Sequence, residues 1–212
     1  MQSVRLKVQQ DGQLMVSCPY QVTDAQVTEF LNQRLNWITQ QQQRLASIRQ
    51  QITATSPTQG MHLWGQYYAF EAIPPAKRKY ETCHSGSKVY LPRLPENLDA
   101  ANLLQQQIWR DELKHLIQTL LPQWQTTMNV EVAFWNVKNM KTKWGSCNVT
   151  KRRIWLSLKL AHYPKECTEM VLVHELTHLL EASHNKRFYQ LMDSFLPNWR
   201  DADLKLKNRT FP

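Results

Sequence analysis

The segment His174-Glu175-Leu176-Thr177-His178 decides the fold of this chain. Residues four positions apart lie one turn apart on the same face of a helix, so His174 and His178 can bind one metal ion. Glu175 lies ~100° around the helix from His174, where its carboxylate can contact a water molecule held by the ion without being a ligand. This spacing predicts a helix that carries a metal site and a general base.

The residues around this motif are almost wholly apolar: Met170-Val171-Leu172-Val173 precede it, Leu176 lies within it, and Leu179 and Leu180 follow it. A helix that is apolar on several faces is buried. Two histidines and a carboxylate in a buried helix need partners, because an unpaired buried charge costs several kcal/mol. A zinc ion provides a partner for all three, which favours a metal site over a chance match of the motif.

The sequence offers two candidates for a third ligand, His184 and Glu181. On a continuing helix His184 would lie ~240° around and ~9 Å along from His178, out of reach of the ion. We therefore expect the chain to turn after about Glu181, with Ser183 or Asn185 capping the next helix. Geometry favours His184, since Glu181 shares a face with His178 but points a turn further on. Three protein ligands leave one position for water, which is typical of a catalytic zinc, and we expect one zinc per chain.

Hydrophobic periodicity predicts a mixed α+β fold around this helix. An alternating hairpin over residues 4–18 has its turn at Asp11-Gly12, and a capping box between Thr23 and Gln26 starts one long helix that reaches about Ile52.

Further strands are predicted over residues 60–92, with a turn at Trp64-Gly65. The remaining predicted elements are a helix from Asn97 to Pro122, strands over residues 130–134 and 154–158, the zinc helix after Pro164 and a last helix over residues 186–195.

The chain has 212 residues, which is enough for one large domain or two small ones. Its composition shifts near residues 91–95, where a β-rich stretch with one long helix gives way to helix, strands and helices. We therefore expect a β-rich N-terminal accessory region over residues 1–95. The catalytic domain is expected over residues 96–212, with the zinc helix packed on a small sheet.

The sequence also predicts where the protein resides. No segment is apolar enough for a secretory signal or a membrane span. The cysteines are far apart and form no CxxC pair, which argues against a disulfide framework or a four-thiolate zinc site. They are Cys18, Cys83, Cys147 and Cys167. We expect a cytoplasmic protein that does not bind membranes.

A run of cations over residues 138–153 contains no acidic residue, in a chain of net charge +9. The cations are Lys138, Lys141, Lys143, Lys151, Arg152 and Arg153, and Trp135, Trp144 and Trp155 are interleaved with them. One interpretation is a solvated surface. The other is a positive rim beside the active site that binds the phosphates of a nucleic acid or nucleotide.

The segment Trp144–Cys147 also has two interpretations. It either shapes a substrate cleft beside the metal or forms a turn in which Trp144 fills the core and Gly145 lets the backbone pass. Tyr189, Arg200 and His162 are candidates for stabilising the oxyanion of the transition state. The candidate substrate-binding residues are therefore Lys143, Trp144, Gly145, Ser146, Cys147, Tyr189 and Arg200.

Taken together, Lys141-Thr142-Lys143-Trp144-Gly145-Ser146-Cys147, Ile154-Trp155-Leu156-Ser157 and the zinc motif with His184 resemble the YgjP-like metallopeptidase family. This is a group of short-spaced zincins related to SprT-type proteases, and the resemblance covers nearly the whole chain. It implies a zincin-like catalytic domain, zinc ligands His174, His178 and His184, and Glu175 as general base. The expected substrate is a peptide or protein, bound along an edge strand within residues 130–140 or 143–149.

Two other functions are considered at this point. Some relatives are labelled nucleotide pyrophosphatases that act on UTP, and the basic run would suit a triphosphate. A nucleic-acid-associated protein with a structural zinc is the non-enzymatic alternative. Glu175 separates these hypotheses, because a purely structural zinc site does not need a carboxylate at that position.

Overall fold

The structure is a computed structural model that describes residues 4–9, 13–53, 56–73 and 79–208. Contacts divide the chain into two compact units, Met1–Thr55 and Ser56–Pro212. Residues 60–91 thus belong with the C-terminal part of the chain, and the functional boundary expected between residues 95 and 96 stays a prediction. Across these described ranges, no helix has both the length and the apolar character that crossing a membrane requires.

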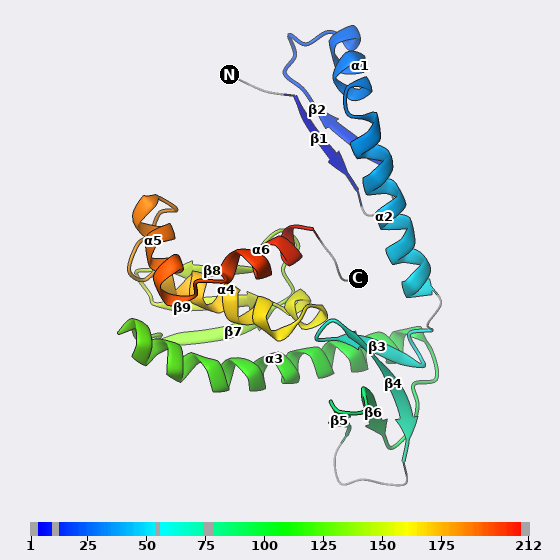
Figure 1. Ribbon diagram of the computed structural model, residues 1–212. Coiled ribbons are helices and arrows are strands. Elements are labelled where there is room, and N and C mark those ends of the chain that lie inside the picture. The colour runs from blue at the N-terminus through cyan, green and yellow to red at the C-terminus, as the bar shows by residue number, and fades with distance from the viewer. Residues whose placement is uncertain (1–3, 10–12, 54–55, 74–78, 209–212) are drawn as a thin grey trace. The chain divides into compact units, whose positions relative to one another are not determined.

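The described part of the first unit has two strands and two helices, β1 (Arg5–Val8), β2 (Leu14–Ser17), α1 (Asp24–Asn32) and α2 (Leu35–Thr53) (Figure 1). The strands form the predicted antiparallel hairpin, whose turn at Asp11-Gly12 lies outside the described residues. The capping box between Thr23 and Gln26 is confirmed. The prediction of one long helix is wrong, because the Arg34 amide donates to the Leu31 carbonyl in a tight turn that separates α1 from α2.

The second unit begins with a sheet in the order β3-β4-β6-β5. Its strands are β3 (Gly60–Leu63), β4 (Gln66–Ala72), β5 (Glu81–Cys83) and β6 (Lys88–Leu91). The predicted turn is confirmed, with φ of 53° at Trp64 and 80° at Gly65, the left-handed values that a two-residue hairpin turn needs. The amides of these two residues donate to the carbonyls of Ala161 and His162, which joins the hairpin to the segment before the zinc helix.

Helix α3 (Leu98–Met128) begins where predicted, and its N-cap is Asn97, whose side chain accepts a hydrogen bond from the Ala100 amide. The prediction that Pro122 ends this helix is wrong. A proline removes one backbone hydrogen bond, but Leu121 and Met128 on either side of it are buried in the core. Packing therefore holds the helix together past the proline.

The following strand also starts later than predicted, at Phe134 rather than Val130. The Val130 amide donates to the Gln125 carbonyl and the Val132 amide to the Gln125 side chain. These two residues alternate like a strand, yet their backbone closes the end of α3 instead of joining a sheet.

A second sheet in the order β7-β9-β8 precedes the helix that carries His174 and His178. Its strands are β7 (Phe134–Lys138), β8 (Gly145–Asn148) and β9 (Arg153–Ser157), followed by the 3-10 helix η1 (Leu158–His162). Strand β7 runs parallel to β9 and β8 runs antiparallel to it. Within the described ranges β7 and β8 pair with β9 alone, so each keeps one free edge.

Helix α4 (Lys165–Thr177) carries the motif and lies at the centre of the second unit. It packs against α3, the second sheet and the two C-terminal helices, α5 (Lys186–Phe195) and α6 (Trp199–Lys207) (Figure 1). Leu172, Val173 and Leu176 are fully buried on α4 and meet Ile154 and Leu156 of β9 in one core. The predicted burial of this helix is confirmed, and the core holds its polar residues in fixed positions.

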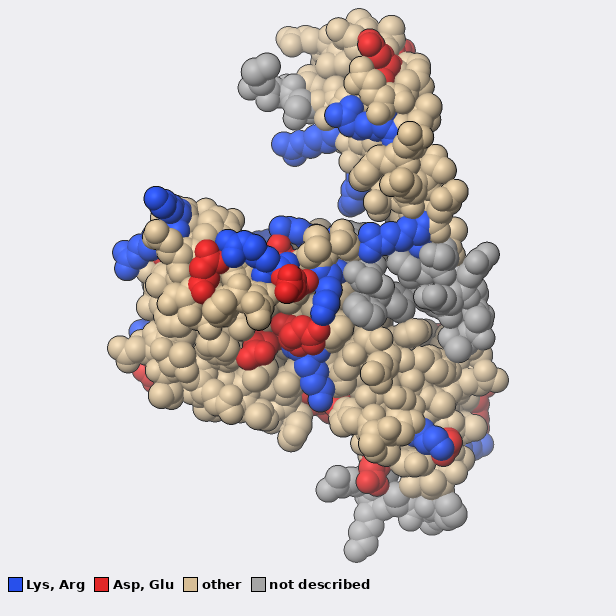
Figure 2. Space-filling view, viewed as in Figure 1, with Lys and Arg blue, Asp and Glu red and all other residues tan. Residues whose placement is uncertain are grey.

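The predicted helix over residues 186–195 is confirmed, but α6 was not predicted. Its buried Ala202 and Leu206 follow Trp199 at helical spacing, a short signal that the sequence does contain. Lys205 forms an ion pair of 2.7 Å with Glu166, which joins α6 to the first turn of α4. Figure 2 shows basic and acidic side chains next to one another over this helix.

Candidate metal centre

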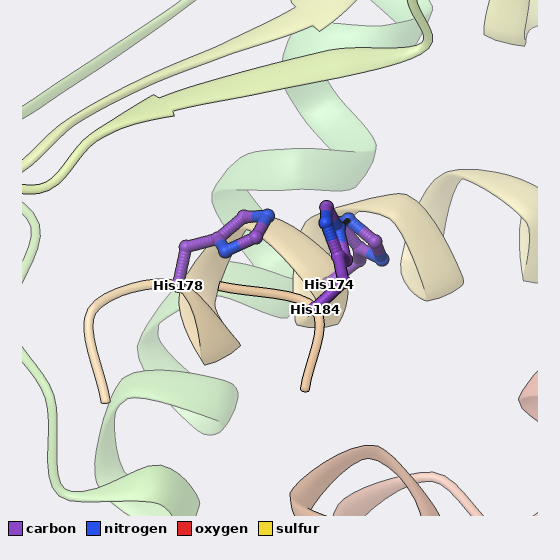
Figure 3. A group of neighbouring side chains, drawn as sticks. All are labelled: His174, His178 and His184. Atoms are coloured by element: carbon purple, nitrogen blue, oxygen red, sulfur yellow. Dashed lines mark hydrogen bonds between the residues drawn. The ribbon is translucent and has the colours of Figure 1, made fainter. Parts of the chain in front are cut away.

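Three histidines converge where α4 ends and α5 approaches, and Figure 3 shows their rings turned toward one another. His174 lies in the last turn of α4, His178 is its C-cap, and His184 lies in the connection to α5. One ring nitrogen of each lies within 4.8 Å of the others, and the Nε2 atoms of His174 and His184 are 3.0 Å apart. Three converging imidazole nitrogens are the donor set that zinc accepts in catalytic sites.

The chain reverses directly after the helix, which brings His184 back to the other two rings. Helix α4 ends at His178 rather than near Glu181 as expected, and the Glu181 amide donates to the Thr177 carbonyl in the turn. Of the two predicted caps for the next helix, Asn185 is the one that the structure uses. The chain therefore turns earlier than predicted, and it brings His184 back to the other two histidines.

Glu181, the competing ligand candidate, is held by the turn itself. Its carboxylate accepts hydrogen bonds from the amide and the hydroxyl of Ser183, at 3.3 and 3.1 Å. Its backbone carbonyl lies 3.3 Å from Nδ1 of His178. A proton on Nδ1 that is donated to this carbonyl leaves the lone pair of Nε2 for a metal ion. Glu181 thus orients one of the three histidines.

The Phe188 ring packs against the imidazole rings of all three histidines. Its ring centroid lies 4.9, 4.8 and 4.7 Å from those of His174, His178 and His184, and its side chain is fully buried. The sequence indicated Phe188 only as an apolar position of α5. Its distance of one helical turn from His184 is the signal that links it to the site.

Burial favours the neutral form of the two histidines on α4, His174 and His178. Burial, reinforced by the neighbouring His178 and His184, lowers the pKa of His174 from 6.5 to about 4. Burial also lowers the pKa of His178. A neutral imidazole is the form that binds a metal ion, so the donor set fits a divalent cation at neutral pH.

Glu175 projects from α4 toward strand β8 and is only 5% exposed. Burial raises the pKa of its carboxyl from 4.5 to about 8, and the charge of Lys143 opposes part of that shift. A Cβ atom at Gly145 would lie 2.5 Å from Glu175 Oε1 and 2.9 Å from Val171 Cγ1, closer than any side chain can approach. Gly145 therefore lets the β8 backbone lie directly against the carboxylate.

The predicted segment Trp144–Cys147 lies beside α4. The interpretation in which Trp144 fills the core and Gly145 lets the backbone pass is confirmed, and the substrate cleft stays a prediction. Trp144 is partly buried against Tyr163, with ring centroids 5.0 Å apart, and so fills the core. Ser146 and Cys147 continue β8, opposite Trp155 and Ile154. Burial, together with the charge of Glu175, raises the pKa of Cys147 to about 11, so this residue is a neutral thiol packed on the core.

Of the residues predicted to stabilise an oxyanion, Tyr189 lies nearest to the histidines. Its ring centroid is 6.5 Å from that of His184, and its side chain is 41% exposed. Arg200 of α6 forms an ion pair with Asp193 of α5, so its charge links these two helices. His162 packs on Trp109 of α3, with ring centroids 4.3 Å apart. Among the three, Tyr189 is the one that borders the candidate metal centre.

The described chain is thus a mixed α+β protein with a histidine group suited to a metal ion. The model of the family described as YgjP-like, metallopeptidase domain, matches residues 2–209, and the chain belongs to this family. Membership supports a metallopeptidase, and more generally a metal-dependent hydrolase. It also implies a metal, typically zinc. No curated protein matches the chain.

Proposed function

We propose that this protein is a zinc metallopeptidase of zincin-like fold, with one zinc ion per chain bound by His174, His178 and His184. The observation that carries the proposal is the convergence of three imidazoles next to a buried carboxylate of α4. The metal, when bound, supplies a Lewis acid that polarises a carbonyl and makes water more acidic. All these residues lie within the proposed catalytic domain, residues 96–212.

Glu175 is the proposed general base. Its carboxylate takes a proton from the attacking water and then donates it to the nitrogen of the leaving amine. Burial suits the second half of this role, because it raises the pKa of the carboxyl and so favours its holding the proton that the leaving amine receives. Tyr189, at the edge of the histidine group, is the side chain that we propose to stabilise the oxyanion.

Strand β8 is the proposed binding edge for a peptide. Both candidate segments supply an edge strand, β7 and β8, but β8 is the one that brings Gly145 to Glu175. An extended peptide added at the free edge of β8 would gain backbone hydrogen bonds. Ser146 and Cys147 of this strand, with Lys143 and Trp144 before it, are the proposed contacts for the substrate.

The test compares two variants that make the same chemical change. Glu175→Gln removes the base, and we expect peptide turnover to fall at least about 10²-fold with zinc content unchanged. Glu181→Gln, the matched control, alters a carboxylate that serves only the turn, so turnover should stay near that of the parent. Near-normal cleavage by Glu175→Gln would refute the assignment of the base. Cleavage of UTP without any cleavage of peptides would refute the proposed substrate class.

A further inference from the structure

The second sheet has one face in the core and one face turned away from it. Side chains alternate along a strand. Val137, Ile154 and Leu156 are buried in the core cluster. Their neighbours on β7 and β9 point to the opposite side, which we call the outer face. On β7 and β9 its accessible part is formed by Phe134, Asn136, Lys138, Arg153 and Trp155, whereas Ser157 at the end of β9 is fully buried.

Two aromatic rings lie together on this outer face. Phe134 is 46% exposed, and its ring centroid lies 6.4 Å from that of Trp155. Trp155 is half-buried, and neither ring is among the apolar side chains packed against the core. A pair of aromatic rings that serves no core contact is available to a partner.

Cations accompany both rings. Lys138 Nζ lies 4.4 Å from the ring centroid of Trp155, and the Arg153 guanidinium carbon lies 5.9 Å from that of Phe134. In the part of the chain that the structure describes, neither cation forms an ion pair with a carboxylate. The sequence contains no acidic residue between Glu131 and Glu166, so the strands and their connections add further cations and no negative charge.

We propose that the outer face binds single-stranded nucleic acid, with bases stacked on Phe134 and Trp155 and phosphates held by Lys138 and Arg153. Every base has a flat face that stacks on an aromatic ring, and the phosphates complement the unpaired cations. An acidic peptide would use the cations but not the rings. In a duplex the bases are already stacked on one another.

This binding surface lies on the other side of the sheet from the proposed general base, although Ser146, a proposed substrate contact, pairs with Trp155. Gly145, which contacts Glu175, pairs with the buried Leu156 and so belongs to the core side of the same sheet. A nucleic acid on the outer face would lie across the sheet from the histidines. Loss of hydrolysis in Glu175→Gln and loss of nucleic-acid binding are therefore separate outcomes.

The test measures binding of an end-labelled oligothymidine to the full chain by fluorescence anisotropy at several salt concentrations. Phe134→Leu should weaken binding roughly ten-fold, because it removes one stacking ring from an exposed position. Phe134→Trp should retain the parent affinity. Lys138→Gln combined with Arg153→Gln should flatten the slope of log K against log salt by about 0.7 for each cation. The matched control is Lys186→Gln combined with Arg187→Gln, two exposed cations at the start of α5, which should leave affinity and slope unchanged.

Three results would overturn the proposal: equal binding by Phe134→Leu and the parent, equal weakening by the α5 control, or competition by polyglutamate as strong as that by oligothymidine. A Trp155→Leu variant extends the test to the second ring. If that variant does not fold, the Phe134 series alone still decides, because Phe134 lies outside the core.

Discussion

Gly145 of β8 lies against Glu175 of α4 with no room for a side chain between them. The nearest heavy atom to a Cβ built at position 145 is Glu175 Oε1, at 2.5 Å, and the next are Glu175 Cγ and Val171 Cγ1 at 2.9 Å. Gly145 and Glu175 are 30 positions apart in the sequence, and the strand and the helix can meet here because glycine has no side chain. This contact sets the distance between the proposed general base and the proposed peptide-binding edge.

The first prediction follows from this contact. Gly145→Ala should destabilise the protein by about 1–3 kcal/mol through overpacking, and peptide turnover should fall because Glu175 or β8 must move. Thermal unfolding and steady-state kinetics measure the two effects. Gly86→Ala is the matched control, because a Cβ there would meet its nearest neighbour, Cys83 Sγ, at an ordinary 3.6 Å. Equal behaviour of the two variants would contradict the proposed role of Gly145.

The second prediction assigns the third ligand. Protein purified without added metal should contain close to one zinc per chain by elemental analysis. His184→Ala should lose most of it, because two imidazoles hold the ion less firmly than three. Glu181→Ala should retain it, since that carboxylate binds Ser183 in the turn. The opposite pattern would assign the third ligand to Glu181.

The third prediction concerns the Phe188 ring, which packs against the three histidines. Phe188→Leu should lower zinc affinity by about 10- to 100-fold, the range for residues that orient metal ligands. The physical reason is that Phe188 contacts all three imidazoles at nearly the same distance. Phe195→Leu makes the same change at the other end of α5 and should leave the affinity unchanged. A competition assay with a chelating dye measures both variants.

The fourth prediction uses the pKa of Glu175, which burial raises from 4.5 to about 8. The folded state thus favours the protonated carboxyl, so its contribution to stability is present below pH 4.5 and is lost as the pH rises through about 8. In metal-free protein, Glu175→Gln should therefore be more stable than the parent at pH 9, by an amount on the order of 4 kcal/mol. The gap should close as the pH falls toward 4.5. Denaturant unfolding at several pH values measures this difference in the free energy of unfolding. A difference that does not change with pH would contradict burial as the cause of the raised pKa of Glu175.

Local patterns were enough to predict several elements. The apolar residues around His174 and His178 indicated a buried helix, and the range 186–195 predicted for the next helix is the range of α5. The hairpin turn at Trp64-Gly65 and the capping box at Thr23 depend on neighbouring residues alone, and both are confirmed. These features were predictable because backbone sterics and hydrogen bonds within a few residues determine them.

Other elements depended on packing between distant segments. Pro122 looked like the end of α3, yet the core on both sides of it keeps the helix intact. Val130 and Val132 show the alternating pattern of a strand. Their backbone amides instead donate hydrogen bonds to Gln125 near the end of α3. Tertiary contacts outweigh a local preference in both cases, because burial of whole side chains is worth more than one backbone hydrogen bond.

The sequence by itself determined that His174 and His178 share one face of a helix, because the helical repeat places residues four apart together, and it favoured His184 over Glu181 as the third member of the group. Only the tertiary structure decided what surrounds those donors. It showed Phe188 beneath all three rings and Gly145 against Glu175, and it separated the inner face of the second sheet from the outer face with Phe134 and Trp155. The physical reason is that helical spacing is a property of one segment, whereas these contacts join segments that meet only when the core forms.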